Sequence, residues 1–180
     1  WFSMKIVVLT GSPHKKGTSA LLADAFIAGA EAAGHSVTRF DCAFLHIGGC
    51  RGCDACRKSG GACVQRDDMA EILPALLAAD LVAFVSPIYY FGLSAQLKAA
   101  IDRFYAANAQ LMGGKKAALL VTCADPVPET VAAARAHYDA ICRYLGWQDA
   151  GVLEGLGLST RADAEATTYP TQARALGASL

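Results

Sequence analysis

The feature that most constrains the fold is an alternation of short apolar segments with longer amphipathic ones. Residues Lys5–Thr10 and Leu81–Ser86 carry apolar side chains at consecutive positions and are rich in β-branched residues. Strands of this kind are buried on both faces, as in a parallel sheet that helices cover on both sides. The sequence therefore predicts a three-layer α/β domain rather than a sheet with one face in water.

The predicted elements follow one another in the order expected of a doubly wound sheet. The five predicted strands are Lys5–Thr10, Ser36–Phe40, Leu81–Ser86, Ala117–Thr122 and Ala150–Glu154. The predicted helices are Thr18–Ala33, Asp68–Ala79, Ser94–Tyr105, Glu129–Leu145 and Ala162–Leu176. Ligands of such sheets bind beyond the carboxyl ends of the strands. The segments after the first, third and fourth strands are therefore the candidate site.

Composition limits the classes of partner. Lysine plus arginine and aspartate plus glutamate number 16 each, so no positive field is available to hold nucleic acid or an anionic membrane. No apolar run approaches the roughly 20 residues that span a bilayer. We expect a single domain over residues 1–180, a small-molecule or protein partner and, from the cysteine pattern and the lack of a secretory signal, a cytoplasmic location. Residues 1–3 precede the first methionine; a cloning remnant and natural sequence are both open interpretations, and these residues carry no argument.

The loop Gly11–Ser19 joins the first predicted strand to the first helix. Its hydroxyls and backbone N–H groups meet at a helix N-terminus, which is a site for anions. It lacks G-x-G-x-x-G, and no Lys-Ser/Thr pair follows its second glycine, so a phosphate monoester is expected rather than a dinucleotide or a nucleoside triphosphate. The alternative is a tight turn with Thr18 or Ser19 as the helix cap.

The loop Ser86–Leu93 places an aromatic cluster after the third predicted strand, before a helix that Ser94 is expected to cap. A rigid proline-containing loop can offer apolar contacts and backbone hydrogen bonds to a flat ring. The alternative is that Tyr89, Tyr90 and Phe91 pack between helices.

Together these segments resemble the NAD(P)H-dependent FMN reductase family. The resemblance rests on the ordered motifs Gly11-Ser12-Pro13, Gly17-Thr18-Ser19, Asp67-Asp68-Met69, Ser86-Pro87-Ile88-Tyr89, Ser94-Ala95-Gln96-Leu97-Lys98 and Ile101-Asp102-Arg103. It implies a flavodoxin-like fold, bound FMN, NAD(P)H as co-substrate, and electron transfer to a small acceptor such as a flavin, quinone, azo or nitro compound. It also implies a homodimer or homotetramer. The alternative is a flavodoxin-type electron carrier, although such carriers are typically acidic and this chain has zero net charge.

The resemblance also implies the site. The first loop would hold the flavin phosphate, the Pro87–Gly92 loop would hold the ring, and the Thr122–Asp125 loop would close its other side. The implied cofactor-binding residues are Ser12, His14, Gly17, Thr18, Ser19, Pro87, Ile88, Tyr89, Tyr90, Phe91, Gly92, Thr122 and Asp125. His14 stands where the family often has arginine, so pH-dependent phosphate affinity is expected because histidine titrates near neutrality. Because the flavin supplies the redox chemistry, no catalytic side chain is assigned.

Four of the seven cysteines form the pattern Cys50-x2-Cys53-x2-Cys56-x6-Cys63. This spacing suits a [4Fe-4S] cluster or zinc and resembles the cysteine motif of iron-sulfur flavoproteins. The preferred interpretation is nevertheless that the first three lie on one face of a helical turn as buried structural thiols. A cluster, redox-active thiols and zinc remain alternatives, and no metal ligand is assigned. The other three cysteines, Cys42, Cys123 and Cys142, are predicted core residues. Asp102 and Arg103 are expected in an ion pair near a helix end, with ligand binding as the alternative.

Overall fold

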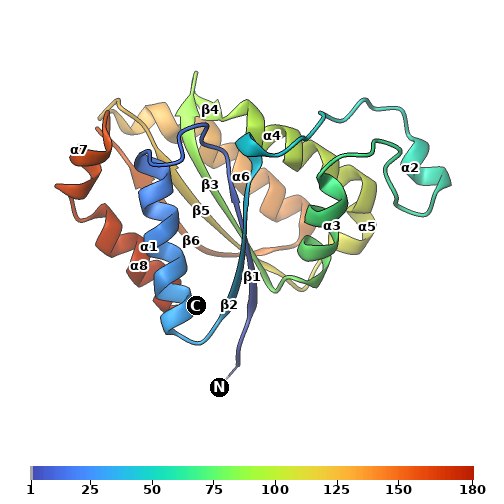
Figure 1. Ribbon diagram of the computed structural model, residues 1–180, viewed down its shortest axis with the longest axis horizontal. Coiled ribbons are helices and arrows are strands. Elements are labelled where there is room, and N and C mark those ends of the chain that lie inside the picture. Colours follow the sequence, from blue (N-terminus) through green and yellow to red (C-terminus); the bar gives the residue numbers. More distant parts are fainter. Residues whose placement is uncertain (1) are drawn as a thin grey trace.

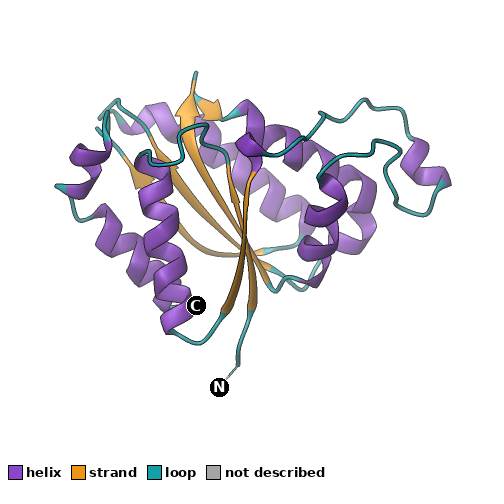
Figure 2. Ribbon diagram, viewed as in Figure 1, coloured by secondary structure: helices purple, strands orange, loops and turns teal. Residues whose placement is uncertain are grey.

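The computed structural model describes residues 2–180 and shows a parallel sheet between two layers of helices (Figure 1, Figure 2). The strand order is β2-β1-β3-β5-β6, and a short β4 pairs antiparallel with β3. The strands are β1 (Lys5–Thr10), β2 (Ser36–Asp41), β3 (Leu81–Tyr89), β4 (Gly92–Leu93), β5 (Lys116–Thr122) and β6 (Gln148–Gly155). The predicted flavodoxin-like sheet of five parallel strands is therefore confirmed.

The helices follow the strands in the expected alternation. They are α1 (Thr18–Ala32), α2 (Ala55–Lys58), α3 (Met69–Ala78), α4 (Ala95–Asp102), α5 (Asn108–Leu111), α6 (Ala132–Leu145), α7 (Arg161–Glu165) and α8 (Tyr169–Ala178). Three 3₁₀ turns complete the set: η1 (Cys42–Phe44), η2 (Arg103–Ala107) and η3 (Pro128–Val131).

The sheet is buried on both faces, as its apolar strands predict. In β1, Ile6 and Val8 belong to the core beneath α1 and α8, whereas Val7 and Leu9 belong to the core beneath α3, α4 and α6. Helices α1 and α8 touch closely because Gly29 and Gly177 lie at their contact, where a Cβ on either would collide with the other helix's backbone. The two cores hold the sheet rigid, so the loops at its carboxyl edge have a fixed base.

Three predicted helices differ from the observed ones. The predicted helix Glu129–Leu145 starts as the 3₁₀ turn η3 and becomes regular only from Ala132, in α6. The predicted helix Ala162–Leu176 is two helices, α7 and α8, because Pro170 has no N–H to continue α7 and instead occupies the first turn of α8. The predicted helix Ser94–Tyr105 ends its regular part at Asp102 and continues as η2. Tightening of a helix end into 3₁₀ geometry is common.

The cysteines divide into two groups. Cys42, Cys123 and Cys142 are buried, which confirms the prediction for them. The buried-thiol interpretation is wrong for the other four: Cys50 and Cys53 are exposed, and Cys56 and Cys63 are partly exposed. The cause is local, since this part of the chain is an irregular loop with one helical turn, α2, rather than a helix with a packed face.

Within residues 2–180, no helix combines the length and the apolar character needed to cross a membrane.

Candidate functional site

A crevice of about 370 Å³ opens at the carboxyl edge of the sheet. Its walls are the segments that follow β1, β5 and β6 and the carboxyl-terminal residues of β3 and β5. Its lining residues are Ser12, His14, Gly17, Thr18, Ser19, Pro87, Ile88, Tyr89, Thr122, Cys123, Ala124, Leu158, Ser159, Thr160 and Arg161. The structure thus brings together the first-loop residues predicted from the sequence with Pro87, Ile88, Tyr89 and Thr122. No carboxylate lines this crevice, whereas His14 and Arg161 do.

The N-terminus of α1 faces the crevice without a side-chain cap. Its N-cap is Gly17 in extended conformation, and its first turn contains no acidic residue. The alternative in which Thr18 or Ser19 caps the helix is therefore wrong, because both lie inside the helix. The Thr18 hydroxyl instead lies 3.1 Å from the Thr122 hydroxyl, which ties the loop after β1 to the end of β5. The first N–H groups of α1 remain available to an anion.

Two buried serines join the loop Gly11–Ser19 to the loop Ser86–Leu93. The Ser94 hydroxyl donates to the Gly11 carbonyl at 2.7 Å, and the Ser86 hydroxyl accepts the Ser94 N–H at 2.9 Å. A Cβ at Gly11 would collide with the side chains of Ser94 and Leu97, so only glycine allows this close approach. Ser94 also caps α4 by accepting the Leu97 N–H, as predicted.

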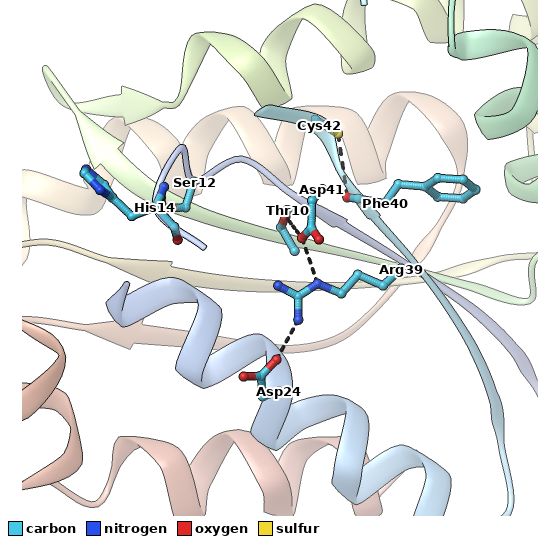
Figure 3. A network of polar contacts seen from close by, with 8 residues as sticks. All are labelled: Thr10, Ser12, His14, Asp24, Arg39, Phe40, Asp41 and Cys42. Atoms are coloured by element: carbon cyan, nitrogen blue, oxygen red, sulfur yellow. Dashed lines mark hydrogen bonds and ion pairs between the residues drawn. The ribbon is translucent and has the colours of Figure 1, made fainter. Parts of the chain in front are cut away.

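A polar network lies behind the first loop (Figure 3). The Asp41 carboxylate accepts from the Thr10 hydroxyl at 2.6 Å and from Arg39 Nε at 2.7 Å. Arg39 also donates to Asp24 on α1 at 2.6 Å. The network connects the ends of β1 and β2 to α1, so it holds the base of the loop that carries Ser12 and His14.

The turn of the aromatic hairpin between β3 and β4 is not part of the crevice lining, although Tyr89 before it is. Tyr90 and Phe91 have φ values of +46° and +70°, and the paired strand residues Tyr89 and Gly92 leave a two-residue turn between them. Tyr90 is 98% exposed. Tyr90, Phe91 and Gly92 therefore lie outside the crevice, and the alternative in which the aromatic residues pack between helices is wrong. Left-handed backbone in two successive bulky residues is strained, and such strain concentrates at functional sites.

Asp125 is also an implied cofactor-binding residue that does not line the crevice. Its side chain makes hydrogen bonds within its own loop. Its carboxylate accepts from the Val127 N–H at 3.0 Å and from the Thr130 hydroxyl at 2.7 Å. These two hydrogen bonds lower the pKa of Asp125. Its neighbour Cys123 does line the crevice, and burial raises the pKa of that thiol.

Sequence reasoning missed the fourth wall of the crevice, Leu158–Arg161. The Leu158 N–H donates to the Cys123 carbonyl at 2.8 Å, which brings this segment beside the loop after β5. A signal was present, since Thr160 and Asp163 form a capping box at the start of α7. A helix start directly after a predicted strand of a parallel sheet lies at the same edge as the other loops.

A second candidate site is the four-cysteine loop, residues 48–66. Cys50, Cys53, Cys56 and Cys63 line one small hollow together with Arg103. Among residues 2–180, no group of three or more histidine, cysteine, aspartate or glutamate side chains is arranged to hold a metal ion. The hollow nevertheless gathers all four thiols of the motif at one place, and its donor set is that of an iron-sulfur centre.

Residues of η2 hold the four-cysteine loop in place. Arg103 donates from Nη1 and Nη2 to the two Asp67 carboxylate oxygens, at 2.6 and 3.1 Å, and from Nη1 to the Gly48 carbonyl at 2.8 Å. Both side chains of this ion pair are almost completely buried. The Tyr105 hydroxyl donates to Asp54 at 2.7 Å and accepts from Arg57 at 3.1 Å. Arg103 and Asp102 are each in an ion pair as expected, but with Asp67 and Lys98 respectively and not with each other.

The ion pair shifts the pKa values of both partners. Burial alone would raise the pKa of Asp67, but the hydrogen bonds from Arg103 and from backbone N–H groups lower it overall. Burial alone would lower the pKa of Arg103, but Asp67, with a smaller contribution from Cys63, raises it overall. Both groups are therefore held in their charged forms.

A third and larger hollow, of about 710 Å³, lies between the four-cysteine loop, α4 and α6. Apolar and aromatic side chains dominate its lining. They include Ile101, Phe104, Tyr105, Ile141, Tyr144 and Leu145. It is remote from the carboxyl edge of the sheet, where doubly wound proteins bind their cofactors.

The fold and the crevice define a flavodoxin-like α/β protein with a ligand site at the carboxyl edge of its sheet. Residues 4–151 match the NADPH-dependent FMN reductase family, and the chain belongs to that family. It is accordingly a flavoprotein oxidoreductase.

Curated relatives agree with the family, and solved structures agree with its fold. The chain is 32% identical to an iron-sulfur flavoprotein of Archaeoglobus fulgidus over 157 residues, covering 86% of the chain and 70% of that protein. It spans about half the length of other curated relatives it matches. An azoreductase of Bacillus anthracis superposes with a TM-score of 0.75 at 21% identity, covering 98% of the chain and all of that structure. An NAD(P)H:quinone oxidoreductase of Methanothermobacter marburgensis superposes with a TM-score of 0.72 at 19% identity, over 98% of the chain and 96% of that structure.

Proposed function

We propose that the chain is an FMN-dependent NAD(P)H oxidoreductase that passes electrons to a small acceptor such as a flavin, quinone, azo or nitro compound. One observation carries the proposal: the uncapped N-terminus of α1 opens into a crevice that no carboxylate lines. Such a helix end binds a phosphate monoester through its N–H groups. The volume of the crevice also lies within the range of ligand pockets.

The residues of the crevice fit FMN chemically. The hydroxyls of Ser12, Thr18 and Ser19 and the first N–H groups of α1 would hold the phosphate. Pro87, Ile88 and Tyr89 would offer apolar and aromatic contacts to the ring. Bound FMN would supply the redox chemistry, taking up a hydride from the nicotinamide and releasing electrons to the acceptor. The task of the chain is then to bind and orient the two rings, which requires no acid or base among its side chains.

FMN titration and steady-state kinetics test this proposal. Thr18→Val removes a hydroxyl at the helix N-terminus, and Thr168→Val is a matched change outside the crevice. We expect Thr18→Val to weaken FMN binding about 10- to 150-fold, because a hydrogen bond to a charged phosphate contributes about 1.5–3 kcal/mol, and Thr168→Val to leave it unchanged. If FMN changed neither protein fluorescence nor melting temperature, the proposal would be wrong.

The electron carrier is tested in the same preparation. Holoprotein that oxidises NADH or NADPH in the presence of a quinone is an enzyme, and a pure carrier gives almost no such turnover. Measuring kcat/KM with quinones, azo compounds, nitro compounds and free flavin in turn then identifies the preferred class of electron acceptor.

A second candidate function is that of an iron-sulfur flavoprotein. It is favoured by the four thiols that line one hollow without being packed in the core, and by the similarity to the Archaeoglobus fulgidus protein. Cys50, Cys53, Cys56 and Cys63 would hold a [4Fe-4S] cluster, which would relay single electrons to or from the flavin.

Anaerobic reconstitution followed by iron and acid-labile sulfide assays tests the cluster. We expect about four of each per chain, as the cluster type requires. Cys53→Ser should abolish them while FMN binding is kept, and Cys142→Ala, which alters a cysteine outside the loop, should not. Absence of iron and sulfide from the reconstituted wild-type protein would remove this candidate.

A further inference from the structure

We propose that Arg103 is a positioning residue of the four-cysteine loop, with its Nε–H group donating a hydrogen bond to a sulfur atom of the iron-sulfur cluster. The inference rests on the second candidate function. The observation behind it is the state of the guanidinium group. Its Nη atoms are engaged by Asp67 and Gly48, whereas Nε is buried and has no hydrogen-bond partner.

The unpartnered Nε stands out in this molecule. It is the one buried side-chain nitrogen or oxygen atom without a partner in the part of the chain that the structure describes. Buried hydrogen-bond donors in native proteins almost always have acceptors. A buried charged group that lacks one of its hydrogen bonds destabilises the folded state. A buried donor without an acceptor indicates that an acceptor lies beside it when the protein holds its cluster.

The position of Arg103 identifies the acceptor. Arg103 lines the same hollow as all four cysteines of the motif, and no carboxylate other than Asp54 shares that lining. Asp54 is already bonded to the Tyr105 hydroxyl. Two other polar side chains of that lining are also engaged, since Gln65 donates to the Gly49 carbonyl and the Tyr105 hydroxyl accepts from Arg57. Cys63 contributes, after Asp67, to the raised pKa of Arg103, so a sulfur atom lies close to the guanidinium. Sulfur is therefore the acceptor assigned to Nε, as a cysteine thiolate or as a sulfide of the cluster.

Asp67 prevents the guanidinium from turning to another partner. Its two oxygens hold the Nη atoms in a bidentate pair, and the same carboxylate accepts the Gly48 N–H at 2.9 Å and the Met69 N–H at 3.2 Å. A planar guanidinium fixed at both Nη atoms has one orientation for its Nε–H. Arg103 thus offers the cluster a fixed donor and a fixed positive charge.

This arrangement predicts an effect on the reduction potential. Reduction of the cluster adds one negative charge, and hydrogen bonds to its sulfur atoms together with a neighbouring cation favour the more negative state. The positive charge of Arg103 is offset by the Asp67 carboxylate that pairs with it. Loss of the Nε–H donor should therefore be what lowers the midpoint potential.

The test uses the double variant Asp67→Asn/Arg103→Met, which removes the charge of both partners and so avoids a buried unpaired carboxylate. Arg135→Met is the matched control, since Arg135 lies on the surface of α6 away from the loop. FMN content, melting temperature, iron, sulfide and the midpoint potential from an EPR-monitored redox titration are measured on each reconstituted protein. We expect the double variant to keep FMN, and its one-electron reduction constant to fall at least 10-fold, which is 59 mV.

The outcomes separate this inference from the cluster proposal. Wild-type protein without iron would remove the cluster and the inference with it. Wild-type protein with a cluster and a double variant of equal potential would overturn the role of Arg103 alone. Loss of iron from the double variant with FMN and melting temperature kept would support the role. If the double variant does not fold, Arg103→Lys decides, because lysine keeps a charge but no donor at Nε: a lower potential supports the role, and an unchanged one overturns it.

Discussion

Replacing Ser94 by alanine would remove the side-chain hydrogen bond that joins the loop Gly11–Ser19 to the start of α4. The Ser94 side chain is fully buried, and its hydroxyl donates to the Gly11 carbonyl at 2.7 Å while it accepts the Leu97 N–H at 3.3 Å. Alanine leaves both backbone groups without their partner. The first group belongs to the loop that would hold the flavin phosphate, and the second to the first turn of α4.

The size of the effect follows from these two losses. Removing a helix N-cap costs about 1 kcal/mol, and leaving a buried carbonyl unsatisfied costs about 1–3 kcal/mol. The free energy of unfolding should therefore fall by about 3 kcal/mol, which for a domain of this length lowers the melting temperature by about 6–12 °C. FMN affinity should fall as well, because Gly11 is no longer fixed to α4.

Urea denaturation followed by the fluorescence of the buried Trp147 measures this change. Ser179→Ala is the control, because the exposed Ser179 hydroxyl also donates to a backbone carbonyl, that of Leu176 at 2.8 Å. It should cost less than about 0.5 kcal/mol, as surface substitutions usually do. A free energy of unfolding for Ser94→Ala within about 0.5 kcal/mol of the wild-type value would refute the reasoning.

Three further predictions concern other parts of the chain. Tyr90→Asn with Phe91→Gly should raise the free energy of unfolding by about 1–3 kcal/mol, measured in urea, because asparagine and glycine suit the left-handed turn; no gain would contradict the assigned strain. In apoprotein, intact-mass analysis after iodoacetamide should show the thiols of the four-cysteine loop modified first and Cys42 last, because burial raises the pKa of Cys42 to about 12; early modification of Cys42 would contradict its burial. The lowered pKa of Asp67 contributes stability above the ordinary aspartate pKa that is lost as pH falls below about 4. Acid denaturation of Asp67→Asn/Arg103→Met should therefore show a flatter pH dependence there, and an unchanged slope would contradict the shift.

Local chemistry made much of the fold predictable. The consecutive apolar residues of β1 and β3 indicate burial on both faces, and the parallel sheet follows from that burial. Ser94 was recognised as a helix cap because capping depends on a residue and its next three neighbours. The first loop was identified for the same reason, since its glycines and hydroxyls stand directly before a helix.

The sequence determined the strands, the helices and three of the segments that line the crevice, because each of these depends on residues that are neighbours along the chain. Only the tertiary structure decided that Asp125 turns toward Thr130, that Leu158–Arg161 closes the crevice, and that Asp67 fixes Arg103 beneath the four cysteines. The closing of the crevice and the Asp67–Arg103 pair depend on which distant groups packing brings together, and Asp125 selects among several nearby donors. Side-chain chemistry alone does not select one partner among many. Burial then strengthens the preference of Arg103 for Asp67, because a charge removed from water is stable only beside the partner that the fold supplies.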